Sequence, residues 1–147
     1  MTLRASVSFE TDFPNDSEEA PSGDITRPAG QNVILVVCEL LRRCGLDVSD
    51  PQQLEYYGWE FMIKYHGAKI LFVLQAYRGA QSLQLNSWNI TPWFRRLFSS
   101  NSILQQRSVL EILNESLRRD GRFRNICWFT EEEFRKHHIP EGGGQAP

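Results

Sequence analysis

Residues 58–65 read GWEFMIKY and residues 68–77 read AKILFVLQAY, with only His66 and Gly67 between the two runs. In the first run, large apolar side chains alternate with mostly polar ones, which is the period-two pattern of a strand with one buried face. Gly67 can supply the positive φ of a two-residue turn, so the runs predict a β-hairpin. The predicted register gives three apolar cross-strand pairs, which are Ile63 with Ile70, Phe61 with Phe72, and Trp59 with Leu74.

The chain on either side of this hairpin predicts further strands and helices. A third strand follows over residues 82–88, after a turn predicted at Arg78 and Gly79, and consecutive strands with short turns pair antiparallel. The other predicted elements are a strand at 6–13, helices at 31–44 and 102–119, a strand at 125–129, and shorter helices from Thr91 and from Thr130.

The order β-α-β-β-β-α-α-β-α predicts an α+β fold with an antiparallel sheet of about four to five strands and helices packed on one face. We expect a single domain over residues 1–139. The Gly-rich residues 140–147 predict a disordered tail.

Apolar stripes at three- and four-residue spacing predict the two longer helices. The stripe of the first helix is Val33, Val36, Val37, Leu40, Leu41 and Cys44. The stripe of the second is Gln106, Val109, Leu110, Leu113 and Leu117. Gly45 follows the first helix, in the position where a left-handed residue ends a helix.

A serine or threonine followed three residues later by glutamate or glutamine is the capping box of helix starts. The pattern occurs three times, as Ser49 with Gln52, Ser102 with Gln105, and Thr130 with Glu133. The first predicts a single helical turn before Gly58, with Pro51 inside that turn. The third predicts the final helix, which Phe129 and Phe134 would hold as a hydrophobic staple.

Composition is typical of one packed domain in a reducing compartment. The chain has 147 residues, is 41% hydrophobic, and has no apolar run long enough to span a membrane, and we expect no secretory leader. Cys38, Cys44 and Cys127 are odd in number and lack Cys-x-x-Cys spacing, so we expect buried free thiols. The expected location is therefore cytoplasmic, with no membrane partner.

Charge is unevenly distributed along the chain. Residues 1–60 hold four basic and eleven acidic side chains, a net charge of −7, and residues 61–147 hold twelve basic and seven acidic ones, a net charge of +5. The asymmetry indicates an acidic binding segment, a basic nucleic-acid surface, or two halves that complement each other in the fold. We favour complementary halves, because halves of a sequence seldom form separate faces of one domain.

The residue types that usually act in catalysis or metal binding do not form a recognisable site in this sequence. His137 and His138 are adjacent and point to different sides of a helix, and no ligand spacing accompanies them, so we expect no metal. Cys38 lies in an apolar helix, which favours a core thiol over a nucleophile. Glu131 to Glu133 are explained by helix capping. We therefore expect no catalytic residues, no cofactor and no enzymatic activity.

Nucleic-acid binding is the less favoured interpretation of the basic C-terminal part. Arginines from Arg95 to Arg135 are interleaved with aromatic residues, which is the composition of a single-strand-binding surface. However, these aromatics lie at core spacings, acids are interspersed, and the pI is near 5.9. Solvated helix faces explain the pattern better, and we expect no nucleic-acid partner.

Protein binding remains, with two candidate segments. The acidic segment at residues 14–30 can recognise a basic partner surface, because concentrated charge speeds encounter and fixes orientation. A strand-to-helix corner also brings Trp and Arg, which are typical anchor residues, close in sequence. The candidate partner-binding residues are Asp16, Glu18, Glu19, Asp24, Trp88, Trp93, Arg95 and Arg96. A mobile loop at 14–30 and core packing of both tryptophans are the commoner alternatives.

Four segments carry a resemblance to known proteins: FP (13–14), GWEF (58–61), WFRRLF (93–98) and ICWFTEEEF (126–134). Over most of residues 5–138 they resemble a family of uncharacterised small bacterial α+β proteins. In size, acidic segment and lack of a catalytic set, the chain is also similar to bacterial toxin-immunity proteins. Its helix–three strands–helix core is similar to dimeric α+β secretion chaperones.

These resemblances imply a non-enzymatic bacterial protein that binds another protein, with a basic toxin as the partner if it is an immunity protein. A chaperone-like homodimer and a small-ligand-binding or enzymatic domain are the alternatives. The chain is expected to be a monomer or a homodimer.

Overall fold

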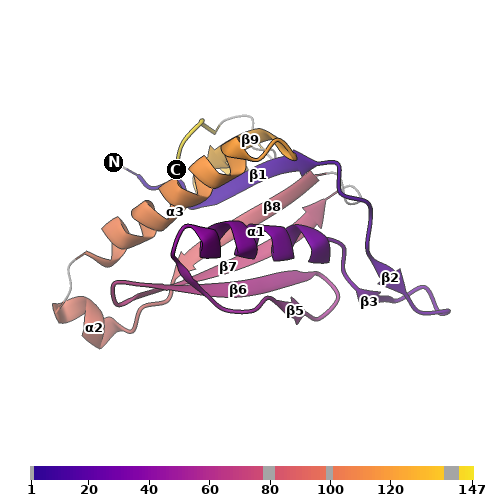
Figure 1. Ribbon diagram of the computed structural model, residues 1–147, viewed down its shortest axis with the longest axis horizontal. Helices are drawn as coiled ribbons and strands as arrows, with labels where there is room; N and C mark the ends of the chain where they lie inside the picture. Colours follow the sequence, from indigo (N-terminus) through magenta and orange to yellow (C-terminus); the bar gives the residue numbers. More distant parts are fainter. Residues whose placement is uncertain (1, 78–81, 99–100, 138–142) are drawn as a thin grey trace.

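The computed structural model describes residues 2–77, 82–98, 101–137 and 143–147, and its elements follow the predicted order with additional short strands (Figure 1). The strands are β1 (Ser6–Thr11), β2 (Glu18–Glu19), β3 (Ile25–Arg27), β4 (Asp47–Val48), β5 (Gln52–Leu54), β6 (Gly58–Tyr65), β7 (Ala68–Tyr77), β8 (Ser82–Asn89) and β9 (Phe123–Phe129). The helices are α1 (Gln31–Arg43), α2 (Trp93–Phe98), α3 (Ser102–Arg119) and α4 (Glu131–His137). The turn predicted at Arg78 and Gly79 lies outside the described residues.

The β6–β7 hairpin has the predicted register. Trp59 pairs with Leu74, Phe61 with Phe72, and Ile63 with Ile70. His66 and Gly67 both have positive φ, 47° and 85°, as a two-residue turn of this hand requires. The rings of Phe61 and Phe72 stack with centroids 4.9 Å apart and an interplanar angle of 3°. The pattern of apolar residues therefore determines which face of the sheet is buried.

The sheet is wider than the predicted four to five strands. Within the described residues its order is β4-β6-β7-β8-β1-β9, with β5 also paired to β6, and its strand pairs are antiparallel. The two extra strands are short pieces at the β6 edge. One of them, β5, replaces the helical turn predicted from Ser49, which was wrong. The Ser49 hydroxyl instead accepts a hydrogen bond from Met62 N at 2.8 Å.

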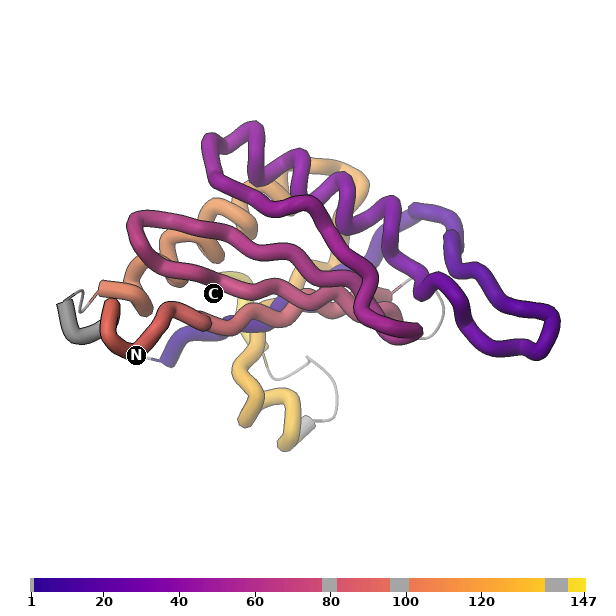
Figure 2. The backbone as a smooth tube through the Cα atoms, turned by 90° about the horizontal axis from the view of Figure 1, so that it is seen from below, coloured from indigo at the N-terminus to yellow at the C-terminus, as the bar shows by residue number. Residues whose placement is uncertain are grey.

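Helices lie on both faces of the sheet, so the expectation of one covered face was wrong. α1 and α3 cover one face, and α4 lies on the other (Figure 2). Alternation along β9 explains the difference, because successive residues point to opposite faces. Trp128 Nε1 donates to Asn114 Oδ1 on α3 at 2.8 Å, whereas the Phe129 ring stacks on Phe134 of α4 at 5.6 Å.

The buried stripe of α1 is rotated from the predicted one. The fully buried residues are Val33, Ile34, Val37, Cys38 and Leu41. Val36 and Leu40 are half-buried and Cys44 is exposed, although all three belonged to the predicted stripe. The stripe of α3 is confirmed, with Gln106, Val109, Leu110, Leu113 and Leu117 all buried. Gly45 has the predicted left-handed conformation, with φ 84°.

Of the three predicted capping boxes, the one at Thr130 forms as expected. Thr130 N donates to Glu133 Oε1 at 2.9 Å, and Glu133 N donates to Thr130 Oγ1 at 3.1 Å. At α3 the predicted box is absent, because the N-cap is Asn101 and Gln105 Nε2 donates to the His66 carbonyl at 2.9 Å. Gln105 therefore ties α3 to the hairpin turn.

The described part of the tail, residues 143–147, lies against β9, where the sequence predicts disorder. Gly144 and Trp128 exchange two backbone hydrogen bonds, each of 2.7 Å. A Cβ at Gly143 would lie 2.1 Å from the Trp128 carbonyl oxygen, so only glycine permits this approach. Arg118 also donates to the Gln145 carbonyl at 2.6 Å.

The rotated stripe of α1 predicts opposite outcomes for neighbouring residues. Ile34→Ala should lower the free energy of unfolding by about 2–5 kcal/mol, because a fully buried side chain leaves a cavity. Leu35→Ala is the matched control, since Leu35 is 47% exposed and its loss should change stability by about 0.5 kcal/mol or less. Urea unfolding of the two variants measures the difference. Equal losses would contradict this burial pattern.

The start of α4 predicts a dependence of stability on pH. The pKa of Glu133 lies below its usual value, chiefly because Arg4 donates to its carboxylate at 3.0 Å, with help from Thr130 N. A lowered pKa in the folded state adds stability above the unfolded pKa, near 4.3, and loses it as pH falls through the folded value. The stability difference between wild type and Glu133→Gln should therefore shrink as pH falls from about 6 to about 3. A difference independent of pH would contradict this role.

Candidate functional site

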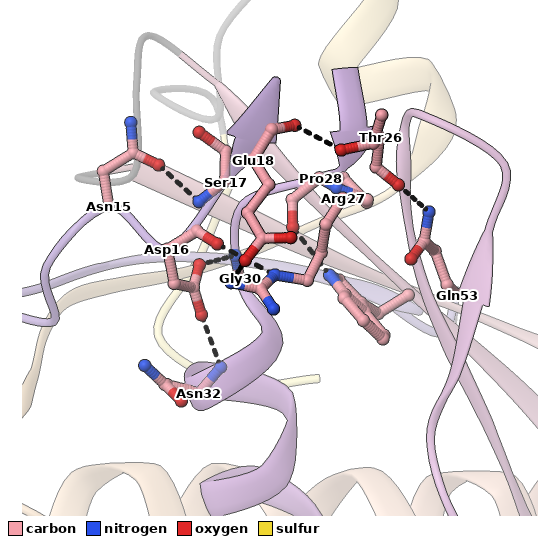
Figure 3. Close-up of polar contacts among 11 residues, drawn as sticks. Asn15, Asp16, Ser17, Glu18, Thr26, Arg27, Pro28, Gly30, Asn32 and Gln53 are labelled. Atoms are coloured by element: carbon pink, nitrogen blue, oxygen red, sulfur yellow. Dashed lines mark hydrogen bonds and ion pairs between the residues drawn. The ribbon is translucent and has the colours of Figure 1, made fainter. Parts of the chain in front are cut away.

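The acidic segment, residues 14–30 (the arm), is a short hairpin anchored to the domain and not a mobile loop. Asp16 accepts hydrogen bonds from Gly30 N and Asn32 N, both at 2.8 Å, at the start of α1 (Figure 3). Gly30 has φ 105°, and a Cβ there would meet Leu74 Cδ2 at 3.1 Å. The negative carboxylate thus satisfies free N–H groups at the positive end of the helix. Asp16 is therefore a structural residue.

Three further contacts fix the base and the middle of the arm. Trp59 Nε1 donates to the Pro28 carbonyl at 3.1 Å, and Gln53 Nε2 donates to the Thr26 carbonyl at 2.8 Å. Within the arm, Arg27 forms an ion pair with Glu18 at 2.8 Å (Figure 3). β2 and β3 pair antiparallel across this ion pair. The arm therefore projects from the domain with a defined backbone.

Two of the four predicted acids remain as exposed charges toward the tip of the arm. Glu19 is exposed, and Asp24 is exposed with its carboxylate accepting from the Ser22 hydroxyl at 2.8 Å. Asp16 is used as the helix cap and Glu18 is paired with Arg27. The acidic character that a partner would meet is thus concentrated at the turn between β2 and β3.

The base of the arm borders a groove of about 400 Å³ that sequence reasoning missed (the arm groove). Its exposed apolar residues are Ile25 (45%), Tyr56 (62%), Tyr57 (44%) and Tyr77 (43%). The Tyr56 and Tyr57 rings meet edge to face at 5.8 Å. Burial raises the pKa of the Tyr77 hydroxyl above its ordinary value. Tyr56 and Tyr57 lie in the turn before β6 and Tyr77 ends β7, so no local pattern relates the pair to Tyr77.

Both tryptophans of the strand-to-helix corner are on the surface, and the expectation of core packing was wrong. Trp88 is 49% exposed and Trp93 is 72% exposed. Trp88 lies opposite Leu71 on β7, a position that faces away from α1 and α3. Other large apolar side chains exposed at this end join them in a set we name the aromatic corner: Trp88, Ile90, Trp93, Phe94, Ile103 and Leu104.

Polar contacts hold the backbone of the aromatic corner in place. Asn89 Oδ1 accepts from the Thr91 hydroxyl at 2.6 Å, and Asn89 Nδ2 donates to the Ser102 carbonyl at 2.9 Å. The Thr91 hydroxyl oxygen accepts from Lys69 N at 3.0 Å. These contacts join the end of β8 to β7 and to the start of α3. The exposed side chains are therefore presented from a fixed framework.

The structure does not bring the predicted binding residues together. The arm lies at one end of the sheet, and α2 with the start of α3 lies at the other (Figure 1). Arg95 is exposed on α2, and the side chain of Arg96 lies outside the described residues. The two halves of the sequence do complement each other at β1 and β9, where Arg124 pairs with Asp12 at 2.7 Å. The predicted site is therefore two separate surfaces.

The cysteines and the other ionisable residues form no centre that we can assign within the described part of the chain. Burial raises the pKa of the Cys38 thiol to about 12, so no thiolate is available there at neutral pH. Cys44 is exposed, contrary to expectation. Across residues 2–77, 82–98, 101–137 and 143–147, no three His, Cys, Asp or Glu side chains are grouped to hold a metal ion. The helices of these ranges are also too short or too polar to cross a membrane.

The position of Asp16 predicts that the arm depends on one carboxylate. Asp16→Asn leaves a single oxygen acceptor and removes the charge, so it should destabilise the protein by about 1 kcal/mol and speed protease cleavage within residues 14–30. Asp24→Asn is the matched control, because it removes one charge from the arm without touching α1. Thermal unfolding and limited proteolysis measure both effects. Equal cleavage rates for the two variants would contradict the anchoring role.

Comparison with known proteins does not assign a function to these surfaces. No protein-family model, no curated protein and no solved structure matches the chain. The resemblance to bacterial toxin-immunity proteins therefore stays a prediction, and the function is argued from the arm and its groove.

Proposed function

We propose that this chain is a non-enzymatic bacterial protein-binding protein that captures a basic protein through the arm and the arm groove, as an immunity protein captures a toxin. The observation that carries the proposal is the junction of an anchored acidic hairpin with three exposed tyrosines and Ile25 around one groove. Exposed apolar side chains gathered around a groove mark interaction sites on monomeric proteins.

The chemistry of the groove favours a protein partner. Tyrosine supplies a large contact area at low conformational-entropy cost, and its hydroxyl gives direction to the contact. Residues of this kind account for most of the binding free energy at interfaces, while surrounding contacts exclude water. Tyr56, Tyr57 and Tyr77 are therefore the proposed anchors, and Ile25 from β3 adds an apolar contact.

The charge of the arm favours a basic partner. Glu19 and Asp24 lie near the tip, and neither forms an ion pair with another of the residues that the structure describes. Acids placed at the edge of an interface speed association and select orientation more than they add affinity. A basic surface with an apolar patch would engage the acids first and the tyrosines second.

The anchoring of the arm favours tight binding. Ordering a mobile loop on binding costs conformational entropy, and a segment held in its bound shape avoids this cost. Asp16, Trp59 and Gln53 already hold the arm in place. The proposed partner thus meets a preformed surface.

The test is affinity capture from the bacterium that carries the gene, followed by binding measurements with the purified partner. We expect a basic protein that is captured at low salt and released as salt rises. Tyr56→Ala/Tyr57→Ala should weaken its affinity about thirtyfold or more, and Glu19→Lys/Asp24→Lys should mainly slow its association.

Trp93→Ala/Phe94→Ala is the matched control for the tyrosine variant, because it removes two exposed aromatics at the opposite end of the molecule. That control should leave the affinity for the basic partner unchanged. Recovery of no specific partner at low salt would refute the proposal. Equal loss of binding in the tyrosine variant and the control would also refute it.

A further inference from the structure

The aromatic corner lies within a part of the chain that has no acidic residue. From Phe61 to Leu110 the sequence contains six basic side chains and neither aspartate nor glutamate. This range includes most of β6, all of β7, β8 and α2, and the first half of α3. Acids from outside this range approach one of its lysines, because Asp47 of β4 lies opposite Lys64 of β6.

Basic side chains lie beside the apolar ones of the corner. Lys64 and Lys69 are opposite each other on β6 and β7, and by alternation they face the same side of the sheet as Trp88. The Ile90 amide donates to the Lys69 carbonyl at 2.8 Å, which places Ile90 next to Lys69. Arg95 is exposed on α2, beside Phe94. Cations thus border the apolar surface.

The apolar side chains of the corner are both aromatic and aliphatic. Trp93 (72%), Phe94 (51%), Ile103 (61%) and Leu104 (59%) are exposed on α2 and the first turn of α3. Nucleic-acid surfaces use aromatic rings for base stacking, and aliphatic side chains such as Ile103 and Leu104 contribute little to it. Aromatic and aliphatic residues bordered by Lys and Arg are the composition of segments that lie in a membrane interface.

We propose that the aromatic corner binds peripherally to the surface of a membrane that contains anionic lipids. Trp93, Phe94, Ile103 and Leu104 insert to the depth of the headgroups, and Lys69 and Arg95 contact the anionic lipids. Such binding needs no spanning helix, so the absence of an apolar run in the sequence does not exclude it. It departs from the expectation of no membrane partner, and it does not rest on the proposed function.

The strength of binding follows from the small size of the corner. A few inserted side chains and a few cations give weak, reversible attachment, to which each cation near an anionic surface adds roughly a fivefold gain in partitioning. Attachment should weaken as salt rises, because the surface potential decays within a Debye length. The arm, with exposed Glu19 and Asp24, would point away from the membrane (Figure 1).

The test is cosedimentation of the full chain with two kinds of vesicle at low salt. One kind is phosphatidylcholine alone, and in the other roughly a third of the lipid is phosphatidylserine. We expect binding to the anionic vesicles only. Trp93→Ala/Phe94→Ala should lower the partition coefficient about tenfold or more, and Arg95→Glu about fivefold or more. Circular dichroism checks that each variant is folded.

Tyr56→Ala/Tyr57→Ala is the matched control, and it should bind the anionic vesicles as wild type does. No cosedimentation of wild type with anionic vesicles would overturn the proposal. Vesicle binding that Trp93→Ala/Phe94→Ala leaves unchanged would also overturn it. A concentration-dependent dimer in sedimentation velocity that the same variant abolishes would instead assign the corner to contact between two copies of this chain, and would equally overturn the proposal.

Discussion

The cross-strand stacking of Phe61 on Phe72 is the contact on which the rest of the structure depends, because it fixes the register of β6 and β7. A slip of one residue would move every side chain of a strand to the opposite face of the sheet. With the register fixed, the face that carries the two rings receives α1 and α3. The other face receives α4 beside β9 and also carries Trp88 and the lysines, so the same contact that builds the core also determines which side chains solvent meets.

Local signals in the sequence were sufficient for most of the fold. The alternation in the hairpin, the stripe of α3 and the box from Thr130 to Glu133 each involve residues close in sequence, and each was predicted correctly. The failures involve distant partners. Ser49 could cap a helix, but in the fold its hydroxyl accepts a hydrogen bond from Met62 N on β6. The residues that follow it pair with β6 as the strand β5. Propensity is a weak guide wherever tertiary contacts compete for the same group.

The candidate site was less predictable than the fold, for the same reason. An aspartate in an acidic segment cannot be recognised as a helix cap until the chain places it beside Gly30, fourteen positions away in the sequence. The exposure of Trp88 and Trp93 depends on which face of the sheet remains uncovered. The groove tyrosines come from β7 and from the turn before β6, and only folding relates them to Ile25. The amino-acid composition was enough to identify the acidic segment. The structure was needed to show that Asp16 caps α1, whereas Glu19 and Asp24 are exposed.

The contact of Gly144 with Trp128 also has a consequence for how the molecule behaves in a crowded solution. β9 is an outer strand of the sheet, and its unpaired amide and carbonyl groups would be a template for strand addition from another chain. The return of Gly143 and Gly144 occupies this edge at Trp128 with backbone from the same molecule. Proteolytic trimming of the last few residues would therefore expose a growth point for edge-to-edge polymers, while leaving the hydrophobic core intact.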